Sequence, residues 1–184
     1  MNPWTRVAIM VFAAGVLTAC GEDKQAKQKV EPAKAALPGP TPEQEQAITA
    51  LKQRGASVDA EGFSSAAASG SFELVNLYLA AGVSLNGKDS RHRTPLQVAA
   101  QGGNVPMVEL LLAKGADINS TDENGSTALM DAAWQGDLLM VEILTAKGAQ
   151  LGAKNKSGYT ALKAAREKNH PQVSDFLVSK GVTE

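Results

Sequence analysis

Few residues of this sequence are of a type that could perform chemistry. It contains one cysteine, Cys20, which excludes a disulfide within the chain and a zinc site made of several cysteines. The two histidines, His92 and His170, are too few for a histidine-rich metal site. A calcium loop places its oxygen ligands at fixed intervals. The acidic residues that could suggest one do not have that spacing: they are Asp117, Asp122, Glu123 and Asp131.

Common catalytic motifs are also absent from the sequence. It has no Gly-Lys-Ser/Thr phosphate loop, no His-Glu-x-x-His and no Gly-x-Ser-x-Gly. The Gly102-Gly103 pair stands alone and is better explained as a turn. We therefore predict that the protein is not an enzyme and needs no metal or organic cofactor. An enzyme with an unrecognised site is the least favoured alternative.

Composition narrows the choice of partners and folds. The 184 residues carry 18 basic and 19 acidic side chains, a formal net charge of −1. Nucleic-acid-binding proteins usually show a strong basic excess, so we expect no nucleic-acid partner. Aromatic residues make up only 4% of the chain, which disfavours a sandwich or barrel with an aromatic core.

The first 20 residues have the pattern of a targeting segment. Arg6 is followed by 13 uncharged residues, from Val7 to Ala19. This run is shorter than the roughly 20 residues needed to span a bilayer, but it suits a signal peptide. It ends in Leu17-Thr18-Ala19-Cys20, which resembles the bacterial lipobox. An ordinary signal peptide and an uncleaved anchor are the alternatives.

The lipobox resemblance implies cleavage after Ala19 and a covalent lipid on Cys20, the only attached group that we expect. Gly21 follows the cysteine, where Asp would signal retention at the inner membrane in enterobacterial lipoproteins. The resemblance thus implies a lipid-anchored protein of the bacterial cell envelope, at the outer membrane and facing the periplasm. Residues 20–41 are polar and proline-rich, which predicts a disordered tether after the signal peptide, residues 1–19.

A repeat of 33 residues organises the rest of the chain. Glycine, threonine, a small pair and one large apolar position recur at this interval: Gly82, Gly115, Gly148 and Gly181; Thr94, Thr127 and Thr160; Ala66-Ala67, Ala99-Ala100 and Ala132-Ala133; Leu77, Leu110, Ile143 and Phe176. The threonines suit the start of a first helix and the glycines the end of a second. One such helix pair cannot bury its own apolar face, so the units must stack.

These residues resemble the ankyrin repeat, on the segments TPLQVAAQGG and VELLLAKGADIN and their 33-residue copies. The resemblance implies an all-α solenoid of stacked helix pairs with β-turn fingers. The repeat domain would cover residues 42–184. It would consist of a capping helix at 42–55 and repeats at about 56–86, 87–119, 120–152 and 153–184. The first repeat lacks the Thr-Pro start, so we expect it to lack its own hairpin.

The sequence departs from the family pattern in two ways. Gln97, Met130 and Lys163 stand where the family has histidine, so we expect the hydrogen bond between Thr and His to be missing. His92 replaces the turn glycine found at Gly125 and Gly158, and the sequence leaves open whether this distorts the first finger.

The resemblance also implies binding of a protein partner through the finger tips and the concave face of the first helices. Carried over by register, the candidate residues are Arg91, Arg93, Gln101, Glu123, Asn124, Trp134, Gln135 and Tyr159, with Ser90, Ser126, Lys156, Ser157, Glu167 and Lys168 as further positions. Trp134 is the strongest candidate, because Trp, Tyr and Arg dominate interface hot spots. The alternative is that Trp134 packs against Gln101 or Lys168. No small-molecule substrate is evident.

The sequence therefore predicts a membrane-anchored lipoprotein that binds a protein partner in the periplasm. A second hypothesis is an accessory or protective factor that regulates one periplasmic enzyme or toxin.

Overall fold

A computed structural model describes residues 39–183 of the chain. Residues 1–38 lie outside this description, and with them the predicted signal peptide, the lipidation site at Cys20 and most of the tether. Residues 39–184 form a compact unit of the chain. Its described part contains nine α-helices: α1 (Pro42–Gln53), α2 (Ala60–Ala68), α3 (Phe72–Ala80), α4 (Pro95–Gln101), α5 (Val105–Ala113), α6 (Ala128–Gln135), α7 (Leu138–Ala146), α8 (Ala161–Glu167) and α9 (Pro171–Ser179).

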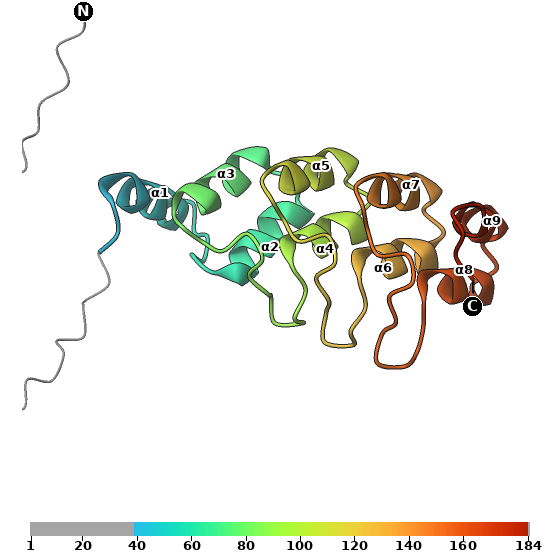
Figure 1. Cartoon of the computed structure of the whole chain (residues 1–184). Helices are drawn as coiled ribbons and strands as arrows, with labels where there is room; N and C mark the ends of the chain where they lie inside the picture. The colour runs from blue at the N-terminus through green and yellow to red at the C-terminus, as the bar shows by residue number, and fades with distance from the viewer. Residues whose placement is uncertain (1–38, 184) are drawn as a thin grey trace, which may run out of the picture. The chain divides into compact units, whose positions relative to one another are not determined.

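The helices of this unit form two rows. Figure 1 shows α2, α4, α6 and α8 stacked in one row, and α3, α5, α7 and α9 in a second row beside it. Helix α1 packs against α3 and so begins the second row. Long hairpin loops precede α4, α6 and α8 and extend past the first row (Figure 1). Apart from one isolated bridge between Thr121 and Thr127, residues 39–183 contain no β-structure. The predicted all-α repeat solenoid is confirmed.

The helices begin where the repeated polar residues stand. Thr94, Thr127 and Thr160 lie at the N-caps of α4, α6 and α8, and each hydroxyl accepts a hydrogen bond from the backbone N–H three residues later. Asn104 and Asp137 do the same for α5 and α7. Such a cap satisfies a backbone donor that has no partner within the helix. The threonines thereby fix where each hairpin loop stops and each first-row helix starts.

Small side chains form the contact between first-row helices. The pairs Ala66-Ala67, Ala99-Ala100 and Ala132-Ala133 are all at most 3% exposed. Leu51 of α1 and Tyr78 of α3 are fully or almost fully buried, which closes the core at its N-terminal end. A single apolar core therefore runs through all the units and holds the hairpin loops in a row.

We refer to residues 88–94, 121–127 and 154–160 as the first, second and third fingers. His92 does not distort the first finger. His92 has a φ of 58°, close to the 76° and 77° of Gly125 and Gly158. Its N–H donates to the Asp89 carbonyl at 2.8 Å, as Gly125 donates to Asp122 at 3.1 Å. The histidine adopts the left-handed conformation that a glycine adopts more easily, and the turn keeps its shape.

Gln97 makes hydrogen bonds in place of the one that the family's histidine would make. Gln97 Oε1 accepts from the backbone N–H of Thr94 at 2.9 Å, and its Nε2 donates to the carbonyl of Ser126 at 2.9 Å. The side chain is 1% exposed. Gln97 thus supplies an acceptor and a donor in the place of a histidine, and it connects α4 to the second finger.

Candidate interaction groove

A groove with a volume of about 470 Å³ lies between the fingers and the first-row helices. Finger residues line one side and helix residues the other: Arg93, Asp122, Asn124, Ser126, Asn155, Ser157 and Tyr159 from the fingers, and Gln101, Met130, Asp131, Trp134, Gln135 and Ala164 from α4, α6 and α8. Most of the candidate residues from the sequence are among them. Arg91 and Glu123 are exposed on the fingers but do not line the groove.

An aromatic pair stands in this groove. The indole of Trp134 is 44% exposed, and its ring centroid lies 6.4 Å from that of Tyr159 in an edge-to-face arrangement. The ammonium group of Lys168 lies 3.9 Å from the Trp134 ring centroid. Trp134 therefore contacts Lys168, as one alternative expected, and still presents a large apolar surface to solvent.

Hydrogen bonds hold Tyr159 in place. Its hydroxyl donates to Glu167 Oε1 at 2.9 Å, and its backbone N–H donates to Asn155 Oδ1 at 2.9 Å. The bond to Glu167 raises the pKa of the Tyr159 hydroxyl above its usual value. Lys163 Nζ lies 4.5 Å from the Tyr159 ring centroid. Each of the two aromatic rings thus contacts a lysine from α8 or the residue after it.

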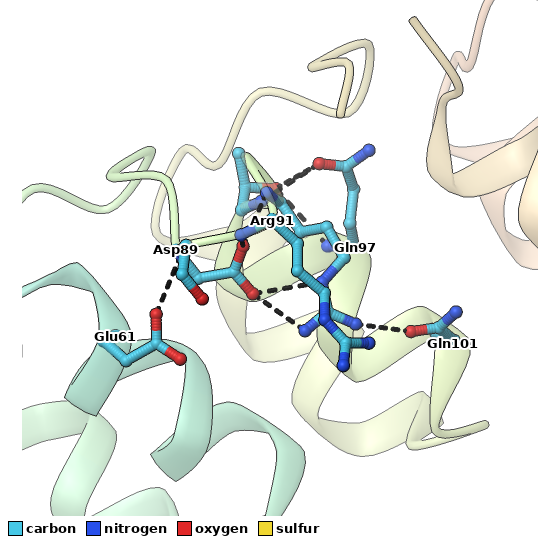
Figure 2. Close-up of polar contacts among 8 residues, drawn as sticks. Glu61, Asp89, Arg91, Gln97 and Gln101 are labelled. Atoms are coloured by element: carbon cyan, nitrogen blue, oxygen red, sulfur yellow. Dashed lines mark hydrogen bonds and ion pairs between the residues drawn. The ribbon is translucent and has the colours of Figure 1, made fainter. Parts of the chain in front are cut away.

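The first finger is fastened at its base by Asp89, whose side chain is 2% exposed (Figure 2). Its carboxylate accepts from the backbone N–H groups of Arg91 and Arg93 at 2.9 and 2.8 Å, and from the Arg93 guanidinium at 2.8 and 3.0 Å. Burial alone would raise the pKa of Asp89, but the hydrogen bonds from Arg93 and Arg91 hold it below its usual value.

Two neighbouring helices fix the finger further. Glu61 of α2 accepts from the Ser90 N–H at 2.8 Å, and Gln101 of α4 accepts from the Arg93 guanidinium at 2.7 Å (Figure 2). Arg93 therefore uses its donors to position the finger rather than standing free for a partner.

Asp131 is a groove residue that the sequence did not single out as a binding residue. It lies in the first turn of α6, and its carboxylate has no hydrogen bond or ion pair with any described residue. Burial, with a contribution from the nearby charge of Asp122, raises its pKa to about 6, while Arg93 acts in the opposite direction. The sequence does contain a signal for this residue. At the equivalent position, 33 residues away on either side, the neighbouring units have the apolar residues Val98 and Ala164, so a carboxyl group at 131 is unusual.

Most residues of the groove lie in a segment that matches a known family. A family model for ankyrin repeats matches residues 63–155 as three repeat copies. The chain is an ankyrin repeat protein. The fourth helix pair of the ankyrin array, α8 and α9, follows the matched residues and keeps the same capping pattern at Thr160. No curated protein matches the chain significantly.

Ankyrin repeats generally serve as protein interaction modules rather than enzymes. Within residues 39–183 of this ankyrin protein, no three His, Cys, Asp or Glu side chains are grouped in a way that could hold a metal ion. Over the same residues, no helix is long and apolar enough to cross a membrane.

Proposed function

We propose that the ankyrin array binds a protein partner in the groove between the fingers and the first-row helices. We further propose that a lipid on Cys20 anchors the chain in the bacterial cell envelope, at the outer membrane and facing the periplasm. The observation that carries the binding proposal is the exposure of Trp134, 44%, within a groove that also contains Tyr159.

The rigidity of the groove supports binding. Tyr159, Arg93 and the first finger are held by hydrogen bonds from several elements, so little side-chain freedom remains to be lost when a partner docks. Preorganisation of this kind increases affinity because it lowers the entropic cost of association. Exposed Trp and Tyr side chains are also the residue types that most often dominate binding energy.

The proposed anchor rests on the sequence Leu17-Thr18-Ala19-Cys20. Three acyl chains on one cysteine bury enough methylene groups for stable attachment, whereas one chain binds only marginally. A disordered segment of about 20 residues reaches roughly 25 Å, so the array could stand away from the bilayer. Anchoring would raise the local concentration of the array near a partner that is also in the envelope.

The binding proposal is tested by affinity capture from detergent-solubilised envelopes of the cell in which the protein is made. The baits are the wild-type chain, Trp134→Ala and the control Leu139→Ala, which truncates a side chain 58% exposed on α7 outside the groove. We expect the wild type and the control to recover the same partner, and Trp134→Ala to weaken its binding by about thirtyfold or more. Equal recovery on all three baits would contradict the proposal.

Thermal melts of the same three proteins separate binding from folding. Trp134 is half exposed, so its truncation should leave the melting temperature close to that of the control. A collapsed melt with unchanged partner recovery would show that Trp134 is structural.

A further inference from the structure

The lining of the groove contains more acidic than basic side chains. Its lining contains one cation, Arg93, and two carboxyl groups, Asp122 and Asp131. Arg93 is already neutralised, because its guanidinium lies 2.8 Å from the buried carboxylate of Asp89 (Figure 2). The two groove carboxyl groups therefore have no cation of their own among the lining residues.

The two carboxyl groups differ in their hydrogen bonding. Asp122 Oδ1 accepts from the backbone N–H groups of Asn124 and Ser126 at 2.8 and 2.7 Å and so shapes the second finger. The Asp131 carboxylate has no hydrogen bond or ion pair among the described residues, although the residue is partly buried. A carboxylate that is removed from water and left unpaired gains most from a cation that enters from outside.

The aromatic pair beside Asp131 suits the same kind of ligand. Cations are attracted to the faces of Trp and Tyr rings. Lys168 already lies over one part of Trp134 and Lys163 over Tyr159, so an incoming side chain would use the part of Trp134 that stays exposed, 44% of the residue. A side chain with an apolar stem and a positive head could pack its stem on Trp134 and place its head at Asp131.

We infer that the groove accepts a basic side chain, lysine or arginine, from an exposed segment of the partner, with Asp131 as its main charged contact. This inference rests on the proposed function, because it identifies the chemistry of the partner at the same groove. Asp131 and Asp122 would repel an acidic segment. A bare metal ion is disfavoured, because no third metal-ligating carboxylate or imidazole joins the pair within residues 39–183.

The fluorescence of Trp134 offers a direct test. The chain has two tryptophans, and the proposed cleavage after Ala19 removes Trp4; the substitution Trp4→Phe keeps Trp134 as the only reporter in any uncleaved chain. The full chain with this substitution, purified in mild detergent, is titrated with three capped pentapeptides. These are acetyl-Gly-Arg-Gly-Arg-Gly-amide and its counterparts with Gln or Glu in place of Arg. We expect a saturable change with the arginine peptide, with a dissociation constant on the order of 1 mM, and none with the other two.

Substitution of the acidic side chain completes the test. Asp131→Asn keeps the shape of the side chain and removes its charge, and should weaken the arginine peptide about fivefold or more. Asp175→Asn is the matched control, because Asp175 is exposed on α9 outside the groove, and it should change nothing. Added salt should weaken the binding as well, because the contact is largely electrostatic.

Three results would overturn the inference: equal responses to the arginine and glutamine peptides, preference for the glutamate peptide, or unchanged affinity in Asp131→Asn. Failure here is distinguishable from failure of the proposed function. If Trp134→Ala loses a captured partner while the arginine peptide does not bind, only the inference falls. If the arginine peptide binds but Trp134→Ala captures the same proteins as wild type, the proposed function falls.

Discussion

At the scale of single residues, His92 shows how a position can keep its backbone shape with an unfavourable side chain. Its φ of 58° is left-handed, a conformation that costs roughly 1–2 kcal/mol for a residue with a Cβ. The equivalent positions, Gly125 and Gly158, avoid that cost. The side chain of His92 is exposed and no hydrogen bond of its imidazole is present in the described structure.

We therefore predict that His92→Gly stabilises the protein. Part of the gain is offset because glycine also has more freedom in the unfolded chain, so the net increase in the free energy of unfolding should be about 0.5–1 kcal/mol. Gly125→Ala at the equivalent position is the converse control and should destabilise. Urea unfolding measures both. A lower midpoint for His92→Gly would mean that the imidazole makes a stabilising contact.

Asp131 leads to a prediction about pH. Its pKa in the folded protein is about 6, above its usual value of 3.8, so the folded state holds the proton more strongly. Stability contributed by this group is thus present at low pH and is lost as pH rises from about 4 to 6. At pH 7.5 the ionised carboxyl group should cost about 1–3 kcal/mol.

Asp131→Asn should accordingly raise the melting temperature at pH 7.5 and have little effect at pH 4. The relevant quantity is the difference between variant and wild type at each pH, because this difference isolates the contribution of Asp131. Asp175→Asn on the exposed face of α9 provides the control, with the same change of charge and no expected gain. An Asp131→Asn difference that does not vary with pH would contradict the assignment.

At the scale of elements, the connection between α4 and the second finger depends on Gln97. We predict that Gln97→Met, which copies the residue at the equivalent position 130, destabilises the protein by about 1–3 kcal/mol. The reason is that methionine leaves the buried N–H of Thr94 and the carbonyl of Ser126 without these partners.

The matched control is Gln172→Met on α9, where the glutamine is exposed and the same change of side chain should cost little. Chemical denaturation compares the two variants. Equal effects would show that the hydrogen bonds of Gln97 contribute nothing beyond side-chain packing.

Much of the element arrangement could be predicted from the sequence, because local features determine it. The threonine caps and small alanine pairs recur every 33 residues and act within one unit or between adjacent units. The family pattern did not reveal what Gln97 and His92 do in the structure. Their roles depend on side-chain chemistry and backbone conformation, because an amide can replace an imidazole and a histidine can adopt a left-handed φ.

The groove could be predicted only in part. The 33-residue repeat predicts that Trp134 and Tyr159 lie on the surface that forms the groove, because the direction of a side chain follows from its position in the repeat. Asp131 was missed because the charges that define its environment, Asp122 and Arg93, lie on two different fingers. The engagement of Arg93 by Asp89 likewise depends on how a finger folds back on itself.

At the scale of the whole molecule, the proposed anchor predicts the fate of Cys20→Ser. Serine has no thiol to receive a lipid, so this variant should remain an unlabelled, unprocessed precursor. Metabolic labelling with a palmitate analogue measures the outcome. Ala19→Gly, which keeps a small residue before the cysteine, is the control and should still be labelled. Equal labelling of wild type and Cys20→Ser would exclude the proposed lipidation.

The central claim is that a protein partner occupies the groove beside Trp134, and site-specific photo-crosslinking tests it most directly. A photoreactive amino acid replaces Gln135, an exposed residue of the groove, so that Trp134 itself is retained. A control protein carries the same amino acid at Leu139, which is exposed on α7 outside the groove. Irradiation in intact cells should give an adduct of one defined mass from position 135 and none from position 139. The additional substitution Trp134→Ala should abolish that adduct. An adduct from position 139 alone, or one from position 135 that persists after Trp134→Ala, would contradict the account.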